Sequence, residues 1–255
     1  MSVSSQPASI FITGASSGIG AALARRYAGP GVHLFLHGRD EARLRSCAKA
    51  ARAAGAQVTT FIGDVTDRKG MLRTIEAADN ERPLDLLIAN AGVSMEDRRD
   101  IPEEDAAERI FAVNVAGVFH TAMPALARMR ERGRGRIAIV SSLAAYHGLP
   151  VGPLYSASKA AIKAWGEGLR VAHASKGVRI SIICPGFIRT PMTARNRFPM
   201  PFLMTAEEAA ERIARRLARG DPLIAFPRSL AAALRIIDML PARLGDRLLG
   251  ALVKA

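Results

Sequence analysis

A tyrosine and a lysine four residues apart, Tyr155 and Lys159, are the most chemically informative pair in this sequence. Residues at this spacing share one face of a helix, so the two side chains can act on one proton. Free tyrosine, with a pKa near 10, is a poor acid or base at neutral pH, but a neighbouring ammonium lowers that pKa. Ser142, thirteen residues before the tyrosine, can stabilise a substrate oxygen as charge builds on it. We expect Tyr155 to donate a proton when a ketone is reduced and to remove one when an alcohol is oxidised.

A glycine-rich run near the N-terminus predicts a site for a dinucleotide. Gly14, Gly18 and Gly20 follow a strand-like segment and open a helical one. Glycines let the backbone turn tightly and approach a pyrophosphate, while the helix N-terminus faces negative charge. The alternative is a glycine-rich turn without a ligand. Because the run lies between a strand and a helix, this alternative is the weaker interpretation.

The elements that must position these residues alternate along the chain. Short apolar or β-branched runs predict strands at residues 9–13, 32–37, 57–62, 84–89, 136–141, 178–184 and 223–226. Helical periodicity predicts helices at 18–28, 41–54, 68–80, 102–131 and 154–175, and Thr205 with Glu208 forms a capping box before another. We therefore expect an α/β fold with a doubly wound parallel sheet of about seven strands and helices on both faces, in one domain spanning residues 1–255.

Composition narrows the class of protein. The chain has 255 residues, of which 49% are hydrophobic and 23% charged, as in ordinary folded proteins. Two cysteines, Cys47 and Cys184, form neither a disulfide framework nor a metal-ligand pattern, so a reducing, cytoplasmic location is expected. The N-terminus lacks the basic and apolar regions of a signal peptide, and no membrane span is expected. The five histidines show no metal-binding spacing, so no metal is expected.

The net charge of +13 raises the question of nucleic acid. Most arginines are interspersed with acids along helices, and only residues 128–136 form a basic cluster. One tryptophan and three tyrosines offer little for base stacking. We therefore expect no nucleic-acid partner. The positive charge suits NADP, an acidic carrier protein or anionic lipid equally well.

Taken together, the motifs resemble those of the short-chain dehydrogenase/reductase family, and the resemblance covers nearly the whole chain. The matching positions are Thr13, Gly14, Ala15, Ser16, Ser17, Gly18, Ile19 and Gly20; Ala89, Asn90, Ala91 and Gly92; Asn114; Ser142; Tyr155 and Lys159; and Cys184, Pro185, Gly186 and Thr190. Ala89 replaces an asparagine found in many relatives. The resemblance implies a Rossmann fold, an NAD(P) cofactor and the catalytic set Asn114, Ser142, Tyr155 and Lys159.

The resemblance also implies individual roles. Lys159 would bond the nicotinamide ribose, Tyr155 would also contact the cofactor, and Asn114 would hold a water that connects Lys159 to solvent. The cofactor would further contact Ser16, Ser17 and Ile19 in the glycine loop, Asp64 and Val65 at the adenine, Asn90, Ala91 and Gly92 at the ribose, the bend at Pro185 and Gly186, and Thr190 at the carboxamide. Asp64 has an alternative role as a helix N-cap.

The end of the second strand indicates which cofactor is preferred. An acid at this position bonds the 2′-hydroxyl of NAD, whereas an arginine accommodates the 2′-phosphate of NADP. The chain has no acid here, and Arg39 stands where NADP-preferring relatives carry theirs. We expect NADP(H) to be preferred, with NAD(H) still possible. Asp40 is expected to cap the helix that begins at Glu41.

Two segments bear on the substrate. Residues 190–205 match the substrate-covering lid of the family, and with Val93, Leu143, Tyr146 and Leu149 they would line a pocket for a hydrophobic carbonyl or alcohol. Simple packing of this loop on the core is an equal alternative. His147 is a further candidate for substrate contact.

The tail, residues 229–255, predicts two helices at 229–240 and 242–253, with Leu244, Leu248 and Leu252 on one face. Packing on the core is the first expectation for it, subunit association the second and peripheral contact with an anionic membrane the third.

The sequence thus predicts hydride transfer between NADP(H) and a small-molecule carbonyl or secondary alcohol. Reduction of 3-oxoacyl groups on a carrier protein is one alternative, and a dinucleotide-sensing or scaffold protein without turnover is another. The resemblance implies a homodimer or homotetramer.

Overall fold

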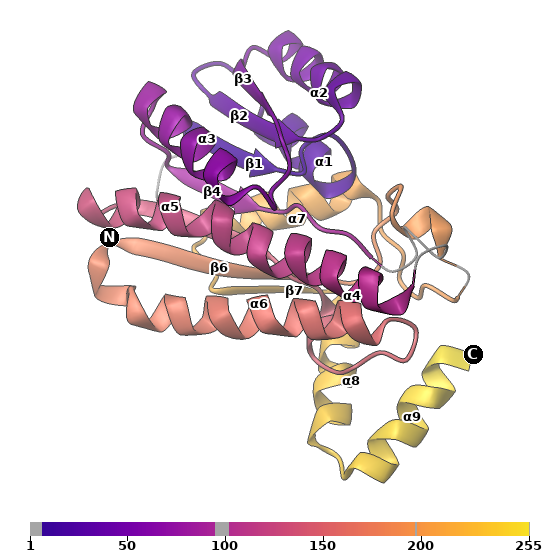
Figure 1. The fold of residues 1–255 in the computed structure, drawn as a ribbon. Helices are drawn as coiled ribbons and strands as arrows, with labels where there is room; N and C mark the ends of the chain where they lie inside the picture. Colours follow the sequence, from indigo (N-terminus) through magenta and orange to yellow (C-terminus); the bar gives the residue numbers. More distant parts are fainter. Residues whose placement is uncertain (1–6, 95–101, 197, 255) are drawn as a thin grey trace.

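Seven parallel strands form one sheet in the order β3-β2-β1-β4-β5-β6-β7 (Figure 1). The structure is a computed structural model that describes residues 7–94, 102–196 and 198–254, and side chains as far as residue 250. The strands are β1 (Ser9–Thr13), β2 (His33–Gly38), β3 (Gln57–Ile62), β4 (Leu86–Ala89), β5 (Gly135–Val140), β6 (Val178–Pro185) and β7 (Leu223–Phe226). Because every pairing is parallel, all carboxyl ends reach the same edge of the sheet.

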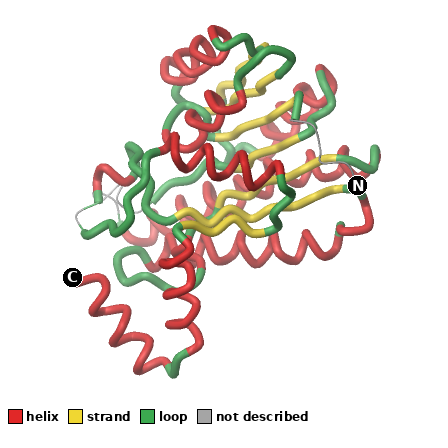
Figure 2. The backbone as a smooth tube through the Cα atoms, turned by 180° about the vertical axis from the view of Figure 1, so that it is seen from behind, coloured by secondary structure: helices red, strands yellow, loops and turns green. Residues whose placement is uncertain are grey.

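Helices cover both faces of the sheet, as Figures 1 and 2 show from opposite sides. The helices are α1 (Gly18–Tyr27), α2 (Glu41–Ala53), α3 (Arg68–Glu81), α4 (Glu103–Phe111), α5 (Gly117–Glu131), α6 (Pro153–Ala172), α7 (Ala206–Ala218), α8 (Arg228–Met239) and α9 (Ala242–Lys254). Helices α1, α2 and α7 bury one apolar cluster with the sheet, and α3, α5 and α6 bury another. The predicted doubly wound α/β fold is confirmed.

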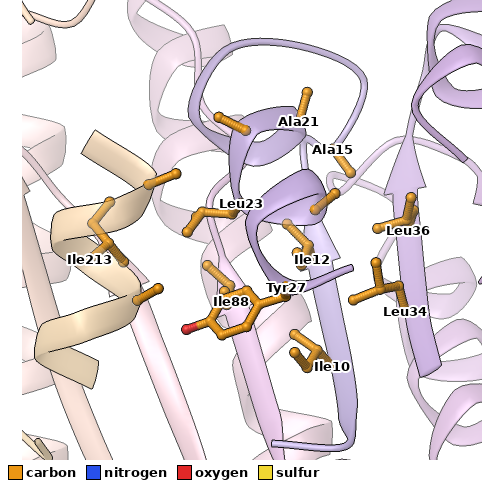
Figure 3. Close-up of a cluster of buried hydrophobic side chains, with 14 of the residues drawn as sticks. Ile10, Ile12, Ala15, Ala21, Leu23, Tyr27, Leu34, Leu36, Ile88 and Ile213 are labelled. Atoms are coloured by element: carbon orange, nitrogen blue, oxygen red, sulfur yellow. The ribbon is translucent and has the colours of Figure 1, made fainter. Parts of the chain in front are cut away.

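Small residues let the first cluster pack tightly (Figure 3). Ala21 and Leu23 of α1 meet Ile12 of β1 and Ile213 of α7 in one buried cluster. The alternation along β1 and β2 divides the core, since Leu34 and Leu36 face this cluster while Phe35 faces the other. The strand predictions are correct to within two residues at each end. Both predicted caps are also confirmed, at Asp40 and in the Thr205–Glu208 capping box.

The helix predicted over residues 102–131 is three consecutive segments instead. Between α4 and α5, Ala112–Ala116 forms one π-helical turn (η2), which carries Asn114. Such a turn widens the helix by one residue and is frequent at functional sites. By length and composition, Glu103–Glu131 could span a membrane, but half of its most apolar stretch is buried inside the protein, as expected of a helix packed on a sheet.

The C-terminal tail forms a helical hairpin, α8 and α9, that projects from the body of the molecule (Figures 1 and 2). Its packing was predicted on the wrong residues. Leu244 and Leu248 are 47% and 43% exposed, whereas Leu249 is buried. The reason is Gly245, four residues before Leu249: a Cβ there would lie 3.2 Å from the carbonyl oxygen of Ile237, so the glycine lets α9 approach α8 closely. Leu252 lies outside the described side chains.

A buried carboxylate connects α3 to α5. Asp79 accepts hydrogen bonds from the Leu84 amide at 2.9 Å, Arg128 Nε at 2.7 Å and Arg132 Nη1 at 2.8 Å. Burial by itself would raise the pKa of Asp79, but the Leu84 amide and the two guanidinium groups outweigh it, so the pKa is lowered. This stabilisation is therefore present above the ordinary carboxyl pKa and is lost as the pH falls through the lowered one.

We predict that Asp79→Ala lowers the free energy of unfolding by about 2 kcal/mol, because it leaves two arginines and an amide without their acceptor while the arginines keep partial contact with water. Urea unfolding at pH 7 measures the change. Glu41→Ala, which removes the exposed ion pair with Arg45, should cost less than about 0.5 kcal/mol. The difference between wild type and Asp79→Ala should narrow in acid, and a constant difference from pH 7 to pH 3 would contradict this account.

Candidate active site

A cleft of about 720 Å³ runs along the carboxyl ends of the strands. Its volume lies within the range of ligand-binding pockets. The predicted residues that line it are Gly14, Ser16, Ser17, Gly18, Ile19, Arg39, Asp64, Val65, Asn90, Ala91, Gly92, Ser142, Tyr155, Lys159, Pro185, Gly186 and Thr190. Of the predicted site residues, Gly20 and Asn114 do not line it. Both lie directly behind it and support its wall.

The glycine loop is shaped as a cradle. Gly14 and Gly18 have φ angles of +65° and +53°, which favour glycine. A Cβ on Gly14 would lie 2.9 Å from Asn90 Nδ2, and one on Gly20 would lie 2.3 Å from the carbonyl oxygen of Gly14. Gly20 therefore permits the close packing of α1 under the loop. Backbone without side chains facing a wide polar cleft fits the pyrophosphate of a dinucleotide.

An ion pair lies in the part of the cleft that follows β2 and β3. Arg39 lies beside Asp64, with Nη1 3.3 Å from Oδ2, and its side chain is 52% exposed. Asp64 accepts from the amide and hydroxyl of Thr66, both at 2.9 Å. Asp67 caps α3 instead, accepting from the Gly70 amide. The alternative role of Asp64 as a helix N-cap is therefore wrong.

Three further arginines that the sequence analysis did not single out also line the cleft: Arg43, Arg109 and Arg195. Arg43 follows Arg39 by four residues and lies in the first turn of α2, and this spacing was the available signal. Arg109 and Arg195 come from distant segments, α4 and the loop after β6, and no local pattern indicates them.

Asn114 is fully buried and organises the cleft from behind. Its Oδ1 accepts from the Val93 amide at 2.8 Å, and its Nδ2 donates to the Val93 carbonyl at 3.0 Å and to Ser158 Oγ at 3.0 Å. A Cβ on Gly92 would lie 3.2 Å from Asn114 Oδ1 and 3.3 Å from Lys159 Nζ. Gly92 therefore leaves room for Asn114 and Lys159 to lie beside the chain that leaves β4.

Tyr155 and Lys159 lie on one face of α6, with Lys159 Nζ 5.7 Å from the centre of the tyrosine ring. Lys159 Nζ donates to the carbonyl oxygen of Val140 at 3.0 Å. Burial lowers the pKa of Lys159 to about 8. Burial also raises the pKa of Tyr155 to about 12, although a hydrogen bond with Ser142 acts in the opposite direction.

In the protein without cofactor, the Tyr155 pKa is thus raised, and its lowering by Lys159 together with the positive nicotinamide of an oxidised cofactor stays a prediction for the complex. The cost of removing a phenolate from water exceeds the effect of an ammonium that bonds Val140 instead.

A second, smaller cavity of about 180 Å³ opens from the same place, and Ser142 and Tyr155 line both cavities. Leu143 and Leu149 line the smaller cavity as predicted, whereas Val93 lines the larger cleft. Tyr146 is not among its lining residues, because its hydroxyl accepts from Arg235 of α8 at 3.1 Å.

His147 does not line either cavity. Its Nδ1 lies 3.3 Å from Asp238 Oδ1, also on α8. The candidate substrate contact at His147 is thus an anchor for the tail. Arg197 of the predicted lid lies outside the described residues.

With this geometry in hand, comparison with known proteins gives the class. Residues 8–199 match the family model for short chain dehydrogenases. An uncharacterised oxidoreductase of Myxococcus xanthus is 41% identical over 237 residues, covering 92% of this chain and 93% of the relative. A ketoacyl reductase of Nostoc sp. is 32% identical over 196 residues, covering 76% of this chain and 68% of the relative. The chain belongs to the short-chain dehydrogenase family of NAD(P)-dependent oxidoreductases.

Solved structures agree on the fold. A short-chain dehydrogenase from Sphingobium yanoikuyae in complex with NADPH superimposes with a TM-score of 0.79 at 25% identity, covering 93% of this chain and 94% of that one. A short-chain dehydrogenase/reductase from Burkholderia phymatum in complex with NAD gives the same TM-score and identity, covering 89% and 91%. Both dinucleotides therefore occur in structures of this shape.

Lys159 is expected to donate a hydrogen bond to the nicotinamide ribose. We therefore predict that the affinity for the dinucleotide decreases by about fivefold as the pH rises through about 8, the pKa at which Lys159 loses its charge. The group is charged below that pKa and neutral above it, and a hydrogen bond from a charged donor is stronger than one from a neutral donor by about 1 kcal/mol. Fluorescence titration of NADPH between pH 6.5 and 9.5 measures the step. Lys159→Met should bind more weakly and show no step near pH 8, and a step that persists in this variant would assign it to another group.

Proposed function

We propose that the protein transfers a hydride between NADP(H) and a ketone or secondary alcohol with a hydrophobic substituent. One observation carries this proposal: Tyr155 and Ser142 line both the polar cleft and the apolar cavity. A group that reaches both cavities can act where a cofactor in one meets a substrate in the other. Catalytic chemistry therefore belongs at this junction.

The residues at the junction have separate roles in the proposed reaction. A dinucleotide bound in the cleft would supply the hydride in reduction and accept it in oxidation. Tyr155, whose pKa of about 12 keeps the phenol protonated at neutral pH, is suited to donate a proton to the substrate oxygen. Ser142 holds that oxygen as negative charge develops. In oxidation Tyr155 acts as the base, and the Lys159 ammonium then favours the phenolate.

Asn114 has a positioning role in this proposal. Its bonds to Val93 and Ser158 connect the chain leaving β4 to the helix that carries Tyr155 and Lys159. The water that relatives hold at this asparagine would complete a path for protons from Lys159 to solvent.

The preference for NADP(H) rests on Arg39. Its pairing with Asp64 is long and half-exposed, which makes it a weak interaction. A 2′-phosphate, with its greater charge and several acceptor oxygens, would compete well for this guanidinium. Arg43 adds a second positive charge nearby, although it is paired with Asp40. NAD(H) remains a possible second cofactor.

Reduction of 3-oxoacyl groups on an acidic carrier protein is the second candidate. The ketoacyl reductase among the relatives and the net charge of +13 favour it. The small, mainly apolar cavity favours a free hydrophobic substrate. A non-catalytic sensing or scaffold role would make no use of the tyrosine hydroxyl, which gives a direct test.

We further propose a cytoplasmic homodimer or homotetramer. The free cysteines Cys47 and Cys184, both buried, suit a reducing compartment. Across the residues that the structure describes, no group of three or more acidic, histidine or cysteine side chains is arranged to hold a metal ion. The reaction assigned to Tyr155 and Ser142 requires none.

For the cofactor, we expect Arg39→Ala to weaken NADPH binding by about tenfold or more and to change NADH binding by less than about twofold, since a charge-assisted bond to phosphate contributes about 1.5–3 kcal/mol. Fluorescence titration of both nucleotides gives the two affinities. Arg45→Ala, whose side chain is 75% exposed, is the matched control and should change neither. Equal losses for NADPH and NADH would remove the basis for NADP preference.

For the chemistry, Tyr155→Phe should lower kcat for ketone reduction by a factor on the order of 10² to 10⁴ with NADPH binding retained, because the variant loses the proton donor and keeps the aromatic ring. Cofactor oxidation is followed by absorbance with a panel of hydrophobic ketones. Tyr27→Phe, in the buried cluster of α1, is the control. Full activity in Tyr155→Phe would exclude its role as the acid, and absence of turnover in the wild type with intact NADPH binding would favour the sensing role.

A further inference from the structure

One wall of the apolar cavity comes from the C-terminal hairpin. Leu230 and Leu234 of α8 and Leu249 of α9 line it, together with Ser142 and Tyr155. Leu234 and Leu249 are 4% and 6% exposed and belong to one buried cluster. The segment that matches the family model ends at residue 199. The wall is therefore built by a part of the chain outside that segment.

The rest of the cavity is also suited to hydrocarbon. Phe198 and Pro199, from the loop after β6, line it together with Leu143. Two of its polar side chains are used within the protein: Ser156 Oγ accepts from the Leu149 amide at 3.1 Å, and Thr193 Oγ1 donates to the Ile188 carbonyl at 2.6 Å. A polar substituent here would lose its bonds to water with little in return, whereas an apolar one gains by leaving water.

Two polar contacts fasten the hairpin to the loop that follows Ser142. The Arg235 guanidinium donates to Tyr146 Oη at 3.1 Å and lies 4.9 Å from the centre of its ring. One turn further along α8, Asp238 pairs with His147. Leu234 also shares a buried cluster with Leu143, which follows Ser142 directly, and the two polar contacts add to this packing.

We propose that this hairpin is the substrate-selecting wall of the active site, with Leu234 and Leu249 as specificity-determining residues. The ligand class is a ketone or secondary alcohol whose carbonyl end meets Ser142 and Tyr155 and whose other end is a compact hydrocarbon group. The cavity, at about 180 Å³, is smaller than the roughly 300–1,000 Å³ of pockets for drug-sized ligands, which selects against long or bulky substituents. This inference rests on the proposed reductase function.

The test compares a compact aromatic ketone, acetophenone, with a smaller one, butanone, in the wild type and in Leu234→Trp. The added ring fills the cavity, so kcat/KM for acetophenone should decrease by about tenfold or more while that for butanone changes by less than about threefold. Ile236→Trp is the matched control, because Ile236 is 60% exposed on the same helix, and it should change neither value. NADPH titration verifies that each variant is folded.

A second variant changes the cavity in the opposite direction. Leu249→Ala should increase kcat/KM for the larger 2-acetylnaphthalene relative to acetophenone by about tenfold. Two results together would overturn the selecting wall and leave the reductase proposal intact. The first is that Leu234→Trp lowers kcat/KM equally for all ketones while it still binds NADPH. The second is that Leu249→Ala leaves the ratio of kcat/KM for 2-acetylnaphthalene and acetophenone unchanged.

A binding measurement separates this inference from the proposed function. Saturation-transfer NMR of acetophenone with the wild type and Leu234→Trp detects occupancy of the cavity without turnover. Acetophenone binding that is lost in Leu234→Trp and kept in Ile236→Trp supports the wall, even if no ketone is reduced. The absence of ketone reduction would count against the reductase proposal alone. No binding to the wild type would overturn the wall.

Discussion

The site depends on one hydrogen-bonded junction between β1 and β4. The Thr13 hydroxyl accepts from the amides of Asn90 and Ala91 at 3.0 and 3.2 Å, and Asn90 Nδ2 returns a bond to the Thr13 carbonyl at 3.0 Å. Strand order reverses here, with β3-β2-β1 extending one way and β4 to β7 the other. The loops that follow the two strands must diverge to opposite faces, which opens a crevice. The hydrogen bonds between Thr13 and the residues after β4 set the distance between the first residues of these two loops.

A second constraint comes from the π turn. Asn114 is buried with both polar atoms of its amide used, and these bonds reach the chain after β4 and helix α6. Regular helical geometry over residues 102–131 would shift the positions after the turn by one residue. The π turn therefore fixes which residues after Asn114 face the site. Its energetic cost is offset by the satisfaction of a buried amide.

Much of this could be predicted from the sequence, because it depends on local patterns. Strand and helix periodicity predicted the fold, and the spacing of Tyr155 and Lys159 placed both on one helix face beside the cleft. The failures involve contacts between distant segments. The π turn at Asn114 follows from its bonds to Val93. The burial of Leu249 in place of Leu248 depends on the close approach that Gly245 allows.

The same limit applies to the tail. Tyr146 and His147 follow Ser142 and were assigned to the substrate pocket for that reason, yet both bind α8. Nothing local to either residue indicates Arg235 or Asp238 as partners. The predicted pocket was therefore right in its apolar character and partly wrong in its composition.

The arginines of the cleft also have a kinetic consequence. Four arginines and Lys159 line it together with two aspartates, Asp40 and Asp64, so positive charges outnumber negative ones, while the ligand that fits it carries several negative charges. Charges that line a cleft concentrate the field there and accelerate the capture of an oppositely charged ligand, an effect screened beyond about 8 Å at physiological ionic strength. The rate at which this protein captures its cofactor should therefore depend on salt, while the proton transfer at Tyr155, which needs no long-range attraction, should depend on it much less.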